Sequence, residues 1–116
     1  MEYLEQFFPL ILFGLFILTY VLRRKKSMEA LKNLDPNALV LDVRSPGEFA
    51  TGNVPGSLNI PVSDLPRRIG EIEKTRSIVV CCASGGRSAM AAAILKGNGF
   101  QKIHDVGPWQ NAMKRG

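Results

Sequence analysis

The chain has 116 residues, a formal net charge of +5 at pH 7 and two adjacent cysteines, so it has room for one modest domain with one additional segment. Neighbouring cysteines lack the usual disulfide geometry, which argues against a disulfide framework and fits a reducing compartment. The sequence has no basic stripe with interleaved aromatic residues, so nucleic acid is excluded as an expected partner.

The first predicted element is an apolar helix. The seventeen residues 6–22 are uncharged, and most of them are Phe, Leu or Ile. At about 1.5 Å per residue this run covers about 25 Å, close to the ~30 Å of a hydrocarbon layer. We therefore predict a transmembrane anchor over residues 1–26, with membrane lipid as its partner. A buried core helix is the weaker alternative because the run is apolar on all sides, and a cleaved signal peptide is weaker because its basic residues should come first.

The charges around this segment predict its orientation. Four consecutive basic residues, 23–26, follow the apolar run, and such clusters stay on the cytoplasmic side of a membrane. We expect a single-pass protein of the cell membrane with its N-terminus outside and residues 27–116 forming a cytoplasmic domain. The same cluster is suited to contact anionic lipid headgroups.

The domain alternates between predicted strands and helices. Short apolar runs predict strands at 38–43, 57–60, 77–81 and 102–106. Caps, helical spacing and terminal glycines predict helices at 27–34, 45–52, 64–74 and 87–96, and a C-terminal helical turn near Trp109 and Met113. This alternation predicts an α/β sandwich with a mostly parallel sheet, in which ligands bind beyond the carboxyl ends of the strands.

The loop after the third predicted strand carries the main candidate site. It consists of Cys82, Ala83, Ser84, Gly85, Gly86, Arg87 and Ser88. A cysteine in a ring of backbone N–H groups, at a helix N-terminus and near a guanidinium, has a lowered pKa and can act as a nucleophile. We therefore predict Cys82 as the catalytic nucleophile and the other six as the substrate-binding loop. The alternative is a strand-end cysteine followed by a plain glycine turn.

Three charged residues near the end of the first strand are candidates for a supporting role. Asp42, Arg44 and Glu48 follow a buried strand whose end should lie near the cysteine loop. We expect Asp42 to pair with Arg87 and to hold the loop closed. The alternative is a local turn or cap interaction of Asp42 with Ser45 and Glu48. Both interpretations make Asp42 a supporting residue.

Three other residues receive structural interpretations. Cys81 should point to the opposite side of its strand from Cys82 and be buried, with a role as resolving thiol as the minor alternative. His104 is the only histidine and is expected to be a polar strand residue, so neither a Cys–His pair nor a metal site is predicted. Trp109 is expected to anchor the last helix, or else to wall the mouth of the pocket.

Three motifs, in this order, together resemble a single-domain rhodanese. They are residues 41–61, the loop 82–88, and a weaker third match made of Gly99, Phe100, Val106, Gly107 and Trp109. The resemblance covers residues 28–114 and implies a rhodanese-like three-layer α/β sandwich with a mostly parallel sheet, here preceded by one transmembrane helix. The chain departs from the family pattern at Asn53, where many relatives have histidine.

The resemblance implies a sulfurtransferase. The family's matching cysteine, Cys82 here, takes a sulfane sulfur from thiosulfate or a persulfide donor, forms a covalent persulfide and passes the sulfur to a thiol or cyanide acceptor, without metal or organic cofactor. The small, uncharged Ala83 and Ser84 favour a persulfide donor. Related phosphatases have five residues between cysteine and arginine, whereas four separate Cys82 from Arg87, so a phosphatase or arsenate reductase is the weaker interpretation.

Two other classes of function remain open. One is a non-catalytic rhodanese-like module that recruits partners to the membrane, although such a module need not retain Cys82 and Arg87. The other is a thiol redox sensor that uses Cys81 and Cys82. Full sulfur transfer by a Cys81→Ser variant would exclude the sensor.

Overall fold

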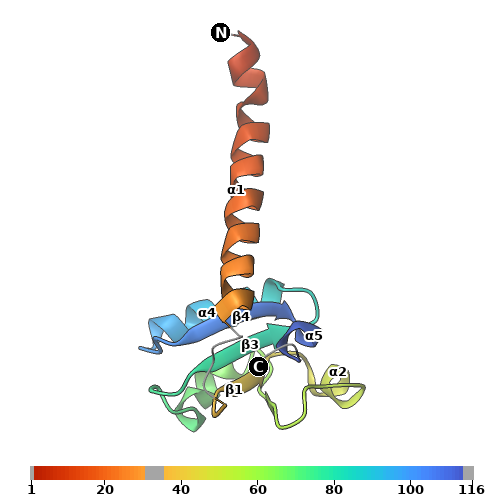
Figure 1. Cartoon of the computed structure of the whole chain (residues 1–116), viewed down its shortest axis with the longest axis vertical. Helices are drawn as coiled ribbons and strands as arrows, with labels where there is room; N and C mark the ends of the chain where they lie inside the picture. Colours follow the sequence, from red (N-terminus) through yellow and green to blue (C-terminus); the bar gives the residue numbers. More distant parts are fainter. Residues whose placement is uncertain (1, 31–35, 114–116) are drawn as a thin grey trace.

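The computed structural model describes residues 2–30 and 36–113, which form one long helix and an α/β body (Figure 1). The elements in chain order are α1 (Glu2–Ala30), β1 (Leu39–Asp42), α2 (Pro46–Ala50), β2 (Leu58–Asn59), α3 (Leu65–Arg68), the 3-10 turn η2 (Ile69–Glu71), β3 (Ile78–Cys82), α4 (Gly86–Gly97), β4 (Ile103–Pro108) and α5 (Trp109–Ala112). Figure 1 shows α1 projecting away from the body, with the N-terminus at its far end.

The four strands form one sheet in the order β2-β1-β3-β4, and every neighbouring pair is parallel. The predicted α/β fold with a parallel sheet is therefore confirmed. The register places Asp42, the last residue of β1, opposite Cys81 of β3. The carboxyl ends of these two strands consequently lie side by side, and the segments that follow them share one edge of the sheet.

The two faces of the sheet carry separate apolar clusters. One cluster joins β1 and β3 to α3 and α4, and it contains Val80, Cys82 and Leu95. The other contains Val79, Cys81 and Ala112, with Trp109 packed against it. Because side chains alternate along a strand, the adjacent cysteines lie on opposite faces. The predicted burial of Cys81, on the face opposite Cys82, is confirmed.

The N-terminal helix differs from its prediction in two ways. A separate helix was expected to begin at Ser27, but α1 continues to Ala30, because residues 23–29 contain no glycine or proline to interrupt it. The remainder of that predicted helix lies outside the described residues. In the part of the chain that the structure describes, no helix has both the length and the apolar character needed to cross a membrane.

The transmembrane anchor predicted for residues 1–26 is therefore not supported. The C-terminal part of α1 instead packs against β4 at the edge of the sheet (Figure 1).

Smaller differences concern the limits of elements. The predicted helix 64–74 is divided into α3 and η2, and Asp64 occupies the N-cap position of α3. Strand β3 begins and ends one residue later than predicted, so it includes Cys82. Strand β4 extends to Pro108, and its pairing with β3 is irregular between Val80 and Cys81. The predicted start of α2 is confirmed, since Ser45 caps it in a reciprocal capping box with Glu48.

Candidate functional site

The loop between β3 and α4 places a backbone donor on the sulfur of Cys82. The N–H group of Gly85 donates a hydrogen bond to Cys82 Sγ at 2.9 Å. Gly85 adopts φ = +122°, a conformation that residues with a Cβ rarely adopt, and α4 begins at the next residue. The hydroxyl of Ser88 donates to the carbonyl of Gly85 at 3.0 Å, so the turn is fastened to the first turn of α4.

The sulfur itself is enclosed. The side chain of Cys82 has no exposed surface and packs within the apolar cluster of the α3–α4 face. The loop residues Ala83, Ser84 and Gly86 are exposed, so the surface above the sulfur consists of small groups. Sγ is therefore not in direct contact with solvent in this conformation of the loop.

Arg87, in the first turn of α4, is held by Glu48 of α2. Its Nη1 donates to Glu48 Oε1 at 2.6 Å and its Nη2 donates to Oε2 at 2.9 Å, which is the two-point geometry of a strong arginine–carboxylate pair. The hydrogen bonds from Arg87, followed by those from Ser45, lower the pKa of Glu48 to about 2. The same pair raises the pKa of Arg87. The loop and α2 are thereby joined across the edge of the sheet.

Asp42 does not pair with Arg87 as expected; it pairs with Arg44. Both carboxylate oxygens of Asp42 accept from Arg44 Nε at 3.0 Å, Oδ2 also accepts from Nη2 at 2.7 Å, and Oδ1 accepts from the Arg44 backbone N–H at 3.0 Å. The two residues are 0% and 4% exposed, so this is a buried ion pair, and its hydrogen bonds raise the pKa of Arg44. The physical reason is proximity: Arg44 folds back on a carboxylate only two residues away and satisfies both of its oxygens.

The guanidinium of Arg44 also connects three segments. It donates to the carbonyls of Gly52 at 2.7 Å and Glu48 at 3.3 Å, and it lies 4.9 Å from the ring centre of Trp109. A Cβ on Gly52 would lie 3.3 Å from the Trp109 ring, so glycine allows this close packing. Trp109 is therefore an anchor of α5, as predicted, and Arg44 is a buried scaffold beneath the Glu48–Arg87 pair.

One residue of this scaffold was not predicted from the sequence. The side-chain amide of Asn59, at the end of β2, donates to the carbonyls of Asp42 at 3.0 Å and Arg44 at 2.9 Å. The carbonyl of Asp42 also accepts from the Ile60 backbone N–H at 3.0 Å, so the amide of Asn59 adds to the backbone pairing at the end of β1. The available signal was an asparagine at the end of a strand, a residue type that bonds to nearby backbone groups.

The remaining candidates lie away from the loop sulfur. Cys81 is buried on the other face of the sheet, and burial raises the pKa of its thiol to about 12. His104 lies in β4 opposite Val79 and is half-buried, which lowers its pKa. His104 thus lies in a strand, as predicted.

Known proteins are similar to this chain in sequence and in fold. Residues 26–107 match the family described as Rhodanese-like domain. The putative sulfur carrier protein YrkF of Bacillus subtilis (strain 168) is 36% identical over 85 residues, which cover 71% of this chain and 46% of the relative. A protein named sulfurtransferase from Allochromatium vinosum is 39% identical over 67 residues, which cover 58% of this chain and 63% of the relative. The chain thus spans between about half and nearly two thirds of the length of these curated relatives.

A solved structure shows the same arrangement of elements. The rhodanese-like domain protein from Staphylococcus aureus is 27% identical and has a TM-score of 0.63, with 73% of this chain and 86% of that chain covered. The family match extends over most of the chain. It includes the whole cysteine loop and all four parallel strands, apart from the last residue of β4. On this evidence the chain belongs to the rhodanese-like domain family.

Proposed function

We propose that this protein is a sulfurtransferase that carries a sulfane sulfur on Cys82. The observation that supports the proposal most is the hydrogen bond from the Gly85 N–H group to Cys82 Sγ at 2.9 Å, at the carboxyl end of a parallel strand. A donor in this position stabilises negative charge on the sulfur, which both a thiolate and a persulfide carry. Relatives named sulfur carrier protein and sulfurtransferase support the same class of reaction.

The reaction proceeds in two displacement steps. The Cys82 thiolate attacks the outer sulfur of a donor, a new S–S bond forms, and the donor's own bond to that sulfur breaks. The leaving group takes the electron pair and departs as sulfite from thiosulfate, or as a thiolate from a persulfide. An acceptor thiolate or cyanide then attacks the outer sulfur of the Cys82 persulfide, and the thiolate of Cys82 is regenerated. No further oxidant or reductant enters either step.

The charged residues have a supporting part in this proposal. Arg87 is aligned by Glu48 in the first turn of α4, where its positive charge favours an anionic donor near the loop. The buried Asp42–Arg44 pair fixes the segment from which Glu48 projects. The exposed loop side chains are the small, uncharged Ala83 and Ser84, which supports a persulfide as the donor over thiosulfate.

Mass spectrometry of the intact chain tests this proposal. After incubation with thiosulfate or with a small-molecule persulfide, we expect a gain of one sulfur atom that a thiol acceptor removes. The gain should persist in Cys81→Ser and be absent in Cys82→Ser. If no donor loads the chain, a module that recruits partners becomes the better interpretation. If loading requires Cys81, the redox-sensor interpretation becomes the better one.

We further propose that α1 attaches the protein to the cytoplasmic face of the cell membrane. Its exposed large apolar side chains include Phe8, Leu10, Ile11, Leu12, Phe13, Leu15, Phe16, Ile17, Leu18, Val21 and Leu22. An apolar surface of this size is costly to leave in water. The basic residues 23–26 follow it directly, as expected for a segment that faces anionic headgroups.

Flotation with lipid vesicles tests the attachment. The full chain should float with vesicles of phosphatidylcholine, whereas a Phe13→Glu/Phe16→Glu variant should remain in the dense fraction. Equal recovery of both proteins in the dense fraction would contradict the attachment. The sulfur-loading assay on the same samples is independent of this result, so the two proposals are tested separately.

A further inference from the structure

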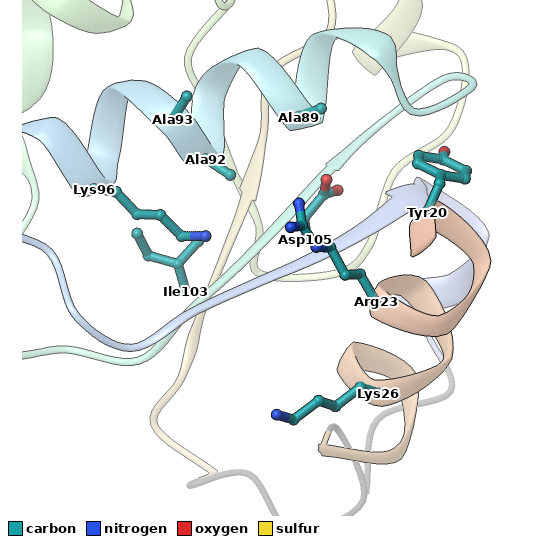
Figure 2. A pocket seen from close by; sticks show the side chains of 9 residues that line it. All are labelled: Tyr20, Arg23, Lys26, Ala89, Ala92, Ala93, Lys96, Ile103 and Asp105. Carbon is teal, nitrogen blue, oxygen red and sulfur yellow. The ribbon is translucent and has the colours of Figure 1, made fainter. Parts of the chain in front are cut away.

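A cavity of about 740 Å³ lies between α1, α4 and β4, apart from the cysteine loop. Its lining residues are Tyr20, Arg23, Lys26, Ala89, Ala92, Ala93, Lys96, Ile103 and Asp105. They come from α1, at the start of the chain, and from the consecutive elements α4 and β4 near its end (Figure 2). The long helix therefore does more than contact the edge of the sheet, because it completes one wall of a cavity.

The charged groups of this cavity are mainly positive. Figure 2 shows Lys96 of α4 and Arg23 of α1 extending from opposite sides toward the space beside Asp105, with Lys26 further along α1. The three basic side chains face a single carboxylate. Asp105 already accepts a hydrogen bond from the Gly107 N–H group at 3.0 Å through Oδ1. An excess of two positive charges thus surrounds a space that is open to solvent.

The remaining lining leaves room for a ligand. The wall supplied by α4 consists of three alanines spaced along the helix, Ala89, Ala92 and Ala93, whose side chains are single methyl groups. Proteins bind phosphate with lysine, which acts as a point charge, and with arginine, which is a planar hydrogen-bond donor. The space is larger than a simple ion pair requires, and it has room for a phosphate ester with its alcohol.

The position of the cavity indicates the source of that phosphate. Tyr20, Arg23 and Lys26 lie at the C-terminal border of the exposed apolar stretch of α1. A phospholipid whose acyl chains lie along this stretch would present its headgroup at the level of the cavity. We propose that the cavity binds the phosphate ester of an anionic phospholipid headgroup. The lipid source rests on the proposed membrane attachment, whereas the phosphate chemistry is independent of it.

Two substitutions of opposite sign test the cavity. Lys96→Gln removes a positive charge, and we expect it to weaken binding about fivefold, the value of one basic residue near an anionic surface. Asp105→Asn removes the negative charge and retains the Oδ1 acceptor for Gly107, so it should strengthen binding about fivefold. Lys74→Gln is the matched control, because Lys74 is exposed and does not line the cavity. Neither Lys96 nor Asp105 has a part in the proposed sulfur chemistry, so sulfur loading should not change.

The full chain in neutral detergent micelles is titrated with phosphatidylglycerol and, separately, with soluble glycerol 3-phosphate, with calorimetry as the readout. Binding of phosphatidylglycerol that changes in opposite directions in the two variants, with the soluble ester at least tenfold weaker, supports the proposal. Equal affinity for both probes would overturn the lipid source. Identical binding by wild type, Lys96→Gln and Asp105→Asn would overturn the site. Failure of flotation with neutral vesicles would count against membrane attachment and the lipid source, whereas the phosphate site would still be tested by the titration with glycerol 3-phosphate.

Discussion

Arg87 and Glu48 form a two-point ion pair, with N–O distances of 2.6 and 2.9 Å, that joins the first turn of α4 to the short helix α2. The two side chains are 37% and 39% exposed, so water and salt reach the pair. We expect its value for function to be geometric, because it fixes the direction of the guanidinium next to the cysteine loop. We therefore expect the pair to affect turnover more than folding.

Replacing Glu48 with Gln tests that role. The variant retains the size of the side chain but removes the charge-assisted hydrogen bonds that align Arg87. We expect kcat/KM for sulfur transfer to fall roughly tenfold, because one of two strong contacts to the arginine is weakened. Glu71→Gln is the matched control, since Glu71 forms a similar fork with Arg68 on an exposed surface at 2.7 and 3.0 Å. Equal losses in the two variants would contradict a specific role for Glu48.

The same pair predicts a dependence of stability on pH. The pKa of Glu48 is lowered from its ordinary 4.5 to about 2, chiefly by the hydrogen bonds from Arg87. A carboxylate with a lowered pKa stabilises the folded state above its ordinary pKa, and this contribution disappears as the pH falls through the folded-state value. The difference in Tm between wild type and Glu48→Gln should therefore be constant from neutral pH to about 4.5 and should shrink between about 4.5 and 2. A difference that vanishes near neutral pH would contradict the pair.

The buried ion pair of Asp42 with Arg44 predicts a large effect of Asp42 on the stability of the fold. Its carboxylate is fully buried and neutralises Arg44, so Asp42→Asn leaves a buried, poorly compensated guanidinium. We expect a loss of about 3–5 kcal/mol in the free energy of unfolding, measured by urea denaturation. Asp64→Asn provides the control, because it removes an ion pair whose Arg67 side chain is 75% exposed and should cost less than about 1 kcal/mol. A similar small loss in both variants would show that the Arg44 pair is not the scaffold described above.

Local patterns in the sequence predicted most of the fold. Continuous apolar runs identify the strands of a covered parallel sheet, and strict alternation along β3 places Cys81 and Cys82 on opposite faces. The start of α2 follows from Ser45 and Glu48, whose reciprocal cap depends only on residues three apart. These features depend on short-range geometry, so they can be predicted without knowledge of the tertiary structure.

The ion pairs near the loop could not be predicted in the same way. Asp42 and Glu48 are both carboxylates. Arg44 is close to both of them in the sequence, whereas Arg87 comes near them only in the folded chain. Only the three-dimensional positions therefore decide which ion pairs form. Arg44 folds back on Asp42, and Arg87 then binds Glu48. The continuation of α1 past Ser27 was missed for a related reason, because a serine is compatible with a helix interior as well as with a cap.

The two cysteines should differ in reactivity. Burial raises the pKa of the Cys81 thiol to about 12, and its side chain faces the cluster that packs against α5. We expect iodoacetamide to leave Cys81 unmodified in the folded protein at mildly alkaline pH and to modify it at once in urea. Peptide mapping by mass spectrometry measures both states. Rapid modification of Cys81 in the folded chain would contradict its burial and would favour the redox-sensor interpretation.

Gly85 has a positive φ, and its backbone N–H group donates a hydrogen bond to the sulfur of Cys82. Its φ of +122° is strained for any residue with a Cβ, so Gly85→Ala should destabilise the fold by about 1–3 kcal/mol. Relief of that strain would turn the peptide whose N–H group lies 2.9 Å from Cys82 Sγ, and sulfur loading should therefore slow. Gly70→Ala is the matched control, because Gly70 lies in η2, outside the cysteine loop, and a Cβ there meets no atom within 4 Å. The Tm and the rate of sulfur loading should both be lower in Gly85→Ala than in wild type, and both should remain near the wild-type values in the control variant. If Gly85→Ala loses stability but loads sulfur at the wild-type rate, the N–H group of Gly85 has no part in stabilising the charged sulfur.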